Sequence, residues 1–255
     1  MPRAGSTLLC NILNQNPKFY ASSTSNLPNM VKRVSEVWVN NPETKNLLDK
    51  FPEETEERML KTLRGIVDNW YHDKDGVVFD KSRAWLGQNL QLQKLCPDAK
   101  VIMCVRDLRD IFASVEKQNK KHALLSEMTE NHSLRFENMF GEKGIIGSPL
   151  INVIDMIKTK PENIFVLKYK DLCRTPEQTM KMIYEFLGEP YFKHQFEDVK
   201  NTSTDCDGFY LNKFPHKGEG KVEVSNSKWQ DHVSEDIADE IMKLGQYYNQ
   251  KLGYE

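Results

Sequence analysis

The residues best suited to chemistry stand at the start of the chain, which reads MPRAGSTLLCNIL. A Gly-Ser-Thr run opens a segment whose leucines and isoleucine have helical spacing, and an arginine stands two residues before the glycine. Backbone N–H groups in the first turn of a helix have no partner within the helix and favour phosphate or another anion. We therefore expect an anion-binding loop made of backbone N–H groups, two hydroxyls and a guanidinium, from Arg3, Ala4, Gly5, Ser6 and Thr7.

Other cationic residues follow apolar runs that are typical of buried strands. VVFD precedes Lys81, KVIMCV precedes Arg106, and NIFVL precedes Lys168 and Tyr169. Parallel strands end at a common edge of their sheet, and ligands bind outside that edge. The sequence therefore predicts that these groups and the anion-binding loop surround one polyanion.

The elements that must position these groups alternate between strands and helices, which predicts an α/β fold with a central parallel sheet flanked by helices. We expect strands at 77–82, 100–107 and 163–172, a loop at 21–29, and an irregular insertion with some helix at 119–147. Helices are expected at 8–16, 52–70, 86–92, 108–121, 149–159, 176–187 and 234–253. A length of 255 residues fits one domain that spans 1–255.

Composition excludes several classes of function. A net charge of −2 gives no basic surface for non-specific binding of nucleic acid. No apolar run approaches the roughly 20 residues that cross a bilayer, and Pro2, Arg3 and Gly5 interrupt any signal peptide. The five cysteines lack a metal-binding or paired spacing, so Cys10 and Cys104 are expected as buried thiols in a cytoplasmic protein without a metal site.

A nucleotide kinase is the first alternative for a phosphate-binding loop. Its motif, G-x-x-x-x-G-K-[ST], carries a lysine after the second glycine, whereas Gly5 is followed by Ser6 and Thr7. A kinase also needs a carboxylate for Mg²⁺, but Arg106 and Lys168 occupy the strand ends. The sequence disfavours a kinase and favours an anion site without a metal.

Four segments together resemble the sulfotransferases that use 3′-phosphoadenosine 5′-phosphosulfate (PAPS). PRAGSTLL resembles their 5′-phosphosulfate loop, and VRDLRDIFAS resembles their 3′-phosphate motif. VLKYKDLCRTPEQTMKMIYEFLG and NSKWQDHVSEDIADEIMKLGQYYNQKLGY are similar to later segments, the second in the style of tyrosylprotein sulfotransferases. The resemblance implies a three-layer, P-loop-like fold and transfer of a sulfuryl group to a hydroxyl or amine, which leaves 3′,5′-adenosine diphosphate.

The resemblance also implies roles for individual residues. Arg3 and Lys81 would be catalytic, and Lys81 would stabilise the moving sulfuryl group or the leaving phosphate. Contacts to the nucleotide would come from Arg3, Ala4, Gly5, Ser6, Thr7, Arg106, Ser114, Tyr169 and Lys228. Structural alternatives are a helix cap at Ser6 and Thr7, ion pairs of Arg106 or Arg109 with Asp107 or Asp110, a solvated Lys81, and packing of Tyr169. The stretch His216-Lys217-Gly218 is similar to a basic tripeptide of the family.

The chain departs from the family in two places. The family has a strand before the phosphosulfate loop, but only Met1 and Pro2 precede Arg3, so we expect a sheet without its first strand or a start that lies upstream. Tyrosylprotein sulfotransferases carry a glutamate about twenty residues after the loop arginine, whereas this region reads YASSTSNLPN. That departure makes tyrosine of proteins a doubtful acceptor and leaves Asp80, Glu36 and His72 as candidate bases.

The acceptor stays open between a small molecule, a carbohydrate and a peptide, and the sequence does not indicate an oligomeric state. A non-catalytic nucleotide-binding relative of these enzymes is the second alternative. The absent strand and the absent glutamate are the features that favour it.

Overall fold

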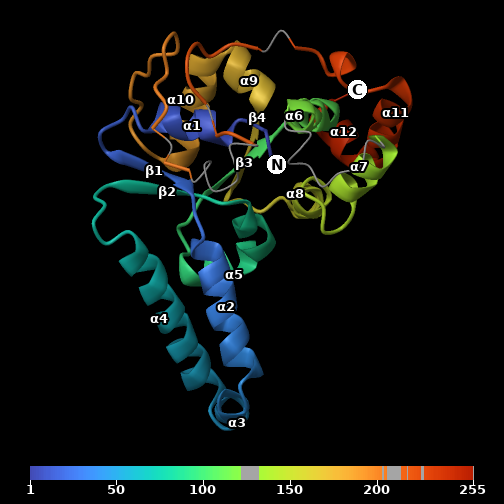
Figure 1. The fold of residues 1–255 in the computed structure, drawn as a ribbon. Helices are drawn as coiled ribbons and strands as arrows, with labels where there is room; N and C mark the ends of the chain where they lie inside the picture. Colours follow the sequence, from blue (N-terminus) through green and yellow to red (C-terminus); the bar gives the residue numbers. More distant parts are fainter. Residues whose placement is uncertain (122–131, 203, 206–213, 217, 225–226, 255) are drawn as a thin grey trace.

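The structure is a computed structural model that describes residues 1–121, 132–202, 204–205, 214–216, 218–224 and 227–254 (Figure 1). Its strands are β1 (Phe19–Thr24), β2 (Val77–Lys81), β3 (Val101–Val105) and β4 (Ile164–Lys168). Its α-helices are α1 (Ser6–Leu13), α2 (Leu27–Asn40), α3 (Pro42–Lys50), α4 (Pro52–Trp70), α5 (Asn89–Leu95), α6 (Leu108–Lys121), α7 (His132–Phe140), α8 (Gly147–Thr159), α9 (Tyr169–Arg174), α10 (Pro176–Leu187), α11 (Glu235–Leu244) and α12 (Gln246–Leu252). Short 3₁₀ helices cover Arg83–Gln88 (η1) and Trp229–Asp231 (η4).

The strands pair in parallel, as the alternation of strands and helices predicts, but they form two two-stranded sheets in place of one central sheet. β1 pairs with β2, with Phe19 opposite Val77, and β3 pairs with β4, with Val101 opposite Ile164. Among the described residues no strand precedes Arg3, which is the arrangement expected from the short N-terminus. The fold is therefore α/β with parallel strands and flanking helices.

Three expectations about single elements were wrong. The segment 21–29 is not a loop, because its first residues belong to β1 and α2 begins at Leu27. The strand expected over 163–172 ends at Lys168, and α9 begins at the next residue. The terminal helix is broken at Gly245, where a Cβ would lie 2.4 Å from Leu108 Cδ1.

The irregular insertion expected over 119–147 is partly helical. Helix α6 continues to Lys121, and α7 and the start of α8 occupy the far end of the segment. Residues 122–131 lie outside the described part of the chain.

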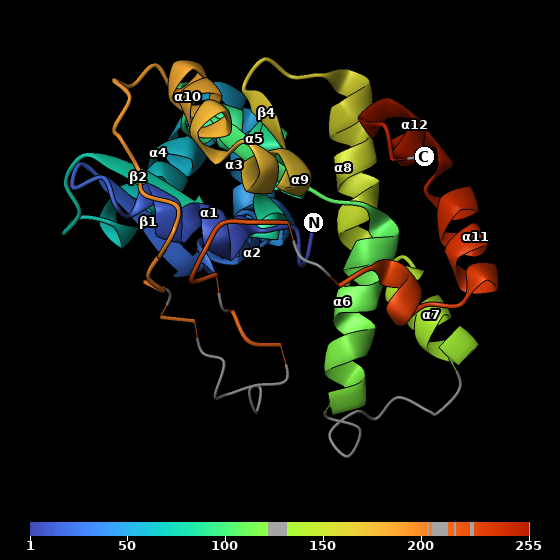
Figure 2. The same ribbon diagram turned by 90° about the horizontal axis from the view of Figure 1, so that it is seen from above.

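The helices build two apolar cores. The larger core lies around α1, the two sheets and α6, α8, α10, α11 and α12, and Phe112, Tyr184 and Tyr248 are almost wholly buried in it. The smaller core joins α2, α4, η1 and α5 around Leu27, Val31 and Leu63. Helices α2, α3 and α4 project from the sheets in Figure 1, whereas α6, α8, α11 and α12 gather on one side in Figure 2.

An apolar cavity of about 340 Å³ lies between the two sheets, with β2 and β3 in its walls. We call it the apolar cavity. Cys10 and Cys104 line it and are buried free thiols, which confirms the expectation for these two residues. The Met1 amino group is buried beside it and donates a hydrogen bond of 2.8 Å to the carbonyl oxygen of Cys104.

Helices in the described parts of the chain are too short or too polar to cross a lipid bilayer.

Candidate active site

The loop before α1 has a backbone conformation that exposes the first turn of the helix. Gly5 is the N-cap residue with φ of 87°, and Arg3 also has a positive φ, 52°. Ser6 and Thr7 are the first two residues of α1, so their hydroxyls do not cap it. A Cβ at Gly5 would lie 2.5 Å from Cδ2 of Tyr169, so a larger residue would collide with that ring.

The loop opens into a cavity of about 570 Å³, which we call the polar cavity. Its walls come from the loop, the end of β2, the strand-to-helix junction after β3, the start of α9, and described residues of the later segment, namely Phe214, Pro215, His216, Gly218, Glu219, Lys221 and Glu223. Most of the sequence-predicted site residues line it, namely Arg3, Gly5, Ser6, Thr7, Lys81, Arg106, Ser114 and Tyr169. Three strand ends and one helix start therefore bring their polar groups together, as the parallel topology requires.

Arg3 and Arg106 lie side by side on one wall of the polar cavity. Arg3 Nε donates to the Ser114 hydroxyl at 3.2 Å, and Arg106 Nη1 donates to the carbonyl oxygen of Arg3 at 3.2 Å. Arg106 Nε also lies 3.5 Å from Asp110, the ion pair considered as a structural alternative. Burial raises the pKa of that carboxyl above its ordinary value. The Arg3 guanidinium is thus held by Ser114 and the carbonyl oxygen of Pro215, and the Arg106 guanidinium by Asp110 and the backbone of Arg3.

The Tyr169 ring packs against Arg106 and Gly5. The Arg106 guanidinium carbon lies 4.6 Å from the centre of the Tyr169 ring, which is a cation–π contact. Burial raises the pKa of the Tyr169 hydroxyl to about 12, so this group stays protonated near neutral pH. Tyr169 therefore supports Gly5 and Arg106 at once, and it also faces the polar cavity.

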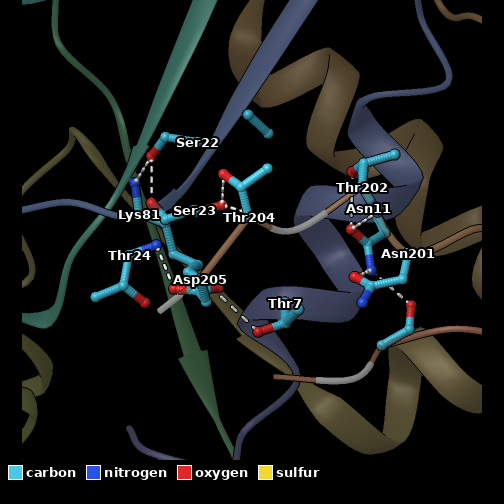
Figure 3. Close-up of polar contacts among 12 residues, drawn as sticks. Thr7, Asn11, Ser22, Ser23, Thr24, Lys81, Asn201, Thr202, Thr204 and Asp205 are labelled. Atoms are coloured by element: carbon cyan, nitrogen blue, oxygen red, sulfur yellow. Dashed lines mark hydrogen bonds and ion pairs between the residues drawn. The ribbon is translucent and has the colours of Figure 1, made fainter. Parts of the chain in front are cut away.

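Lys81 stands at the end of β2 and also lines the polar cavity (Figure 3). Its Nζ donates to the Thr7 hydroxyl at 3.3 Å and lies 2.7 Å from Asp205 Oδ2. Only 10% of the Lys81 side chain is exposed, so the structural alternative of a solvated lysine is wrong. The position places an ammonium group directly beside the first turn of α1.

The described residues that line the polar cavity carry more positive than negative charge. Beyond the predicted cations they include Arg83, His216 and Lys221, and two exposed glutamates, Glu219 and Glu223, offset part of that charge. Burial lowers the pKa of the Arg83 guanidinium, a group that remains charged in proteins. Within the described ranges no three histidine, cysteine or acidic side chains form a group that could hold a metal ion. The site is suited to an anion with several charges.

Comparison with known proteins agrees with this geometry. The model of the sulfotransferase family (Sulfotransfer_3) matches residues 1–193. The chain belongs to the sulfotransferase family. The matched part includes the loop, all four strands and the residues Lys81, Arg106, Ser114 and Tyr169.

Solved structures show the same fold at low sequence identity. The sulfotransferase domain of the Synechococcus PCC 7002 olefin synthase is 19% identical with a TM-score of 0.55, and the match covers 97% of this chain and 91% of that one. The sulfotransferase domain from the curacin biosynthetic pathway is 16% identical with a TM-score of 0.53, and the match covers 100% and 95%. These neighbours share the P-loop-like fold that the sequence predicted. A search of curated proteins found no significant match.

Two residues predicted to contact the nucleotide, Ala4 through its backbone N–H and Lys228 through its side chain, are not among the described residues that line the polar cavity. Ala4 is 1% exposed, and its side chain packs in the larger core. Lys228 is exposed and precedes η4, where its backbone N–H donates to Asp231 at 3.0 Å. Arg109 forms the expected ion pair with Asp107 at 2.7 Å. Lys217 of the His-Lys-Gly stretch lies outside the described residues.

The structure does not bring the three candidate bases to the polar cavity. Asp80 faces the apolar cavity and accepts hydrogen bonds from Tyr71 at 2.5 Å and Trp85 at 2.7 Å. Glu36 lies on α2 beside Lys32 and Arg33, and His72 is exposed after α4. Neither of them lines the polar cavity.

Sequence reasoning missed several charged residues at or beside this site, among them Arg83 and Asp205. Arg83 stands two residues after Lys81, so its place after a strand end was a usable signal. Asp205 contacts Lys81 from a polar segment 124 residues later in the chain, and no local pattern pointed to it. Its contact depends on tertiary structure alone.

Proposed function

We propose that this sulfotransferase uses PAPS as its donor and transfers the sulfuryl group to a hydroxyl or amine of a small molecule, a carbohydrate or a peptide. One observation carries the proposal: Arg3, Lys81 and Arg106, from three separate segments, line one cavity at the N-terminus of α1. Such a set fits a donor with two anionic groups, a phosphosulfate and a separate phosphate. The donor supplies the sulfuryl group, and the chain supplies position and charge.

The protein's contribution follows from where its cations lie. The first-turn N–H groups of α1 and the Ser6 and Thr7 hydroxyls would hold the phosphosulfate, with Arg3 on one side and Lys81 on the other. Transfer builds negative charge on the oxygen that leaves, and fixed cations at that place lower the barrier. Arg106 and Ser114 would hold the second phosphate, because both line the same wall.

The donor is tested by thermal-shift titration with 3′,5′-adenosine diphosphate and, separately, with ATP and Mg²⁺. At a hundred times the dissociation constant, a ligand stabilises the folded state by about 2.7 kcal/mol, which raises the unfolding temperature by roughly 5 °C. We expect this shift for 3′,5′-adenosine diphosphate and not for ATP with Mg²⁺. Stabilisation by ATP with Mg²⁺ alone would instead support a kinase.

A variant at Arg106 tests whether 3′,5′-adenosine diphosphate binds in the polar cavity. Arg106→Ala removes a guanidinium that contacts Tyr169 and the loop, and should cut the shift with 3′,5′-adenosine diphosphate sharply. Arg58→Ala is a matched control on α4, because Arg58 is exposed and pairs with Glu54 at the surface. Equal shifts in the two variants would contradict the proposed phosphate site.

Transfer itself is measured with radiolabelled PAPS and a pool of phenols, glycans and peptides. Transfer of label to an acceptor would support sulfotransferase activity, and the identity of the labelled molecule would give the class of acceptor. Binding of 3′,5′-adenosine diphosphate without transfer to any acceptor would support a non-catalytic relative.

A further inference from the structure

Asp205 is a buried carboxylate that joins the ends of two strands. Its side chain is 4% exposed, and Oδ2 lies 2.7 Å from Lys81 Nζ. Its other oxygen accepts a hydrogen bond of 2.7 Å from the backbone N–H of Thr24, the last residue of β1. Lys81 is the last residue of β2 and pairs with Thr24 in the sheet. Asp205 therefore contacts both strands at the edge that faces the polar cavity.

The segment that carries Asp205 is held in place by α1 and β1 (Figure 3). The backbone N–H of Thr204 donates to the Ser23 hydroxyl at 2.6 Å. Thr202 donates to Asn11 from its backbone at 3.0 Å and from its hydroxyl at 2.8 Å. Asn11 is 2% exposed and also donates to the carbonyl oxygen of Gly218 at 2.8 Å. These bonds place the carboxylate at Lys81 by contacts that do not involve Lys81 itself.

The contact restricts an otherwise flexible side chain. A lysine ammonium has three N–H donors on a four-carbon stem with many rotamers. Asp205 takes one donor and Thr7 lies within reach of another, which leaves a third while Lys81 lines the polar cavity. A buried ammonium also needs a partner, because burying an unpaired charge is unfavourable.

We propose that Asp205 is the positioning residue of this sulfotransferase for Lys81, and that it holds the ammonium against Thr7 so that one N–H faces the donor. The inference rests on the proposed function, in which Lys81 stabilises the charge that transfer builds up. Asp205 is not a lining residue of the polar cavity, and both its oxygens have partners in the protein. It therefore acts through Lys81 and does not accept the acceptor's proton.

The first test is a double-mutant cycle on sulfuryl transfer. Asp205→Asn keeps the shape and the oxygen that faces Thr24, and removes the charge that holds Lys81. We expect kcat to fall about tenfold, within the range of coupling between contacting residues, while KM for PAPS changes less than about threefold. In a Lys81→Met background, Asp205→Asn should lower kcat no further.

The matched control is Asp198→Asn, because Asp198 belongs to the same segment, pairs with Lys200 and has a side chain that is 65% exposed. It should leave kcat unchanged. Asp205→Glu keeps the charge and should recover part of the loss in kcat. A tenfold fall from Asp205→Asn in both backgrounds would overturn the proposal and mark Asp205 as a group that acts independently of Lys81.

The second test does not depend on sulfuryl transfer. Lys81 in the unmodified protein should react slowly with an amine-directed acylating reagent, and mass spectrometry of the peptide with Lys81 measures the rate. We expect about a tenfold faster reaction in Asp205→Asn and no change in Asp198→Asn, given couplings of this size. Thermal unfolding verifies that each variant is folded, and Asp205→Ser replaces any Asn variant that is not.

The two tests separate the two hypotheses. An unmodified protein without transfer, but with Lys81 protected by Asp205, would refute the proposed function and leave Asp205 as the partner that orders Lys81. Equal labelling of Lys81 with and without the Asp205 carboxylate would overturn the positioning role, whether or not the protein transfers a sulfuryl group.

Discussion

The polar cavity and the apolar cavity share part of their walls but differ in the charged and hydroxyl groups that line them. Met1, Ser6, Lys81, Ser82 and Arg83 line both. The rest of the polar cavity carries guanidinium, hydroxyl and backbone N–H groups, whereas the apolar cavity is lined by strand residues such as Phe79 and Met103.

The difference follows from position along the same strands. Residues within β2 and β3 line the apolar cavity between the sheets. Residues at or just after the carboxyl ends of these strands, such as Lys81 and Arg106, line the polar cavity. Phe79, within β2, lines only the apolar cavity, whereas Lys81, at the end of the same strand, also lines the polar cavity. We therefore expect substitutions in the polar cavity to affect turnover first, and substitutions in the apolar cavity to affect stability first.

The largest effect is expected at Lys81, on the boundary between the cavities. Lys81→Met should lower turnover about 100- to 1,000-fold, by analogy with the loss of one group that stabilises transition-state charge. The change should also lower the unfolding temperature, because it leaves the buried Asp205 carboxylate without its ammonium partner. Initial rates with PAPS and thermal unfolding measure the two effects, with Lys200→Met, an exposed lysine, as control. An unchanged rate would refute the role of Lys81.

The apolar cavity is tested at Met103, which is 2% exposed in β3. Met103→Ala should lower the free energy of unfolding by about 2–5 kcal/mol, since it enlarges a space that is already present. The affinity for 3′,5′-adenosine diphosphate should change less than about threefold, because the residue does not line the polar cavity. Denaturant unfolding and nucleotide titration check both numbers. Lost affinity at unchanged stability would contradict the separation of the two cavities.

Asp80 provides a further test of the difference between the cavities, because it is an acidic residue that lines the apolar cavity. Asp80→Asn should lower the free energy of unfolding by about 1–3 kcal/mol, because the carboxylate accepts hydrogen bonds from Tyr71 and Trp85. Turnover should stay within about twofold, since Asp80 does not line the polar cavity. Asp73→Asn, at an exposed pair with Lys74, is the control. A large loss of turnover at unchanged stability would contradict this prediction and identify Asp80 as the general base for the acceptor.

The smallest effect concerns Cys10 and Cys104 and appears only at high pH. Burial raises the pKa of Cys10 to about 12 and of Cys104 to about 11, from an ordinary value of 9.0. Below pH 9 both thiols are protonated in the folded and the unfolded state, so they add no pH dependence. Above it the unfolded chain loses the protons first, and stability should fall as pH rises. Unfolding temperatures at pH 8 and pH 10, compared with the Cys10→Ala, Cys104→Ala variant, measure the effect, and equal slopes would contradict it.

Elements with strong local signals could be predicted from the sequence. Helix α6 follows β3 directly, as its apolar spacing indicates, and α10 begins after Thr175 and ends before Gly188. β1 was missed because its FYASST sequence is mostly polar or small at its end, and only pairing with β2 makes it a strand. The break at Gly245 was also missed; a side chain at this position would collide with Leu108, from a distant part of the chain.

The same distinction holds within the site. Arg3, Lys81 and Arg106 stand at strand or helix ends that local pattern reveals, so their place on a common edge could be predicted. The side chains that contact these residues could not be predicted from the sequence. Ser114 contacts Arg3, a pairing that no sequence pattern indicates, and Asp205 reaches Lys81 across 124 residues.

The order of apolar and polar residues along the chain by itself determined an α/β chain with a phosphate-type loop and cations after its strands, because periodicity and helix-end chemistry are local. Only the tertiary structure decided which groups share the polar cavity, that Asp80 faces the other way, and that Asp205 holds Lys81. The physical reason is that hydrogen bonds and ion pairs form between groups that are close in space, and the folded chain alone determines those distances.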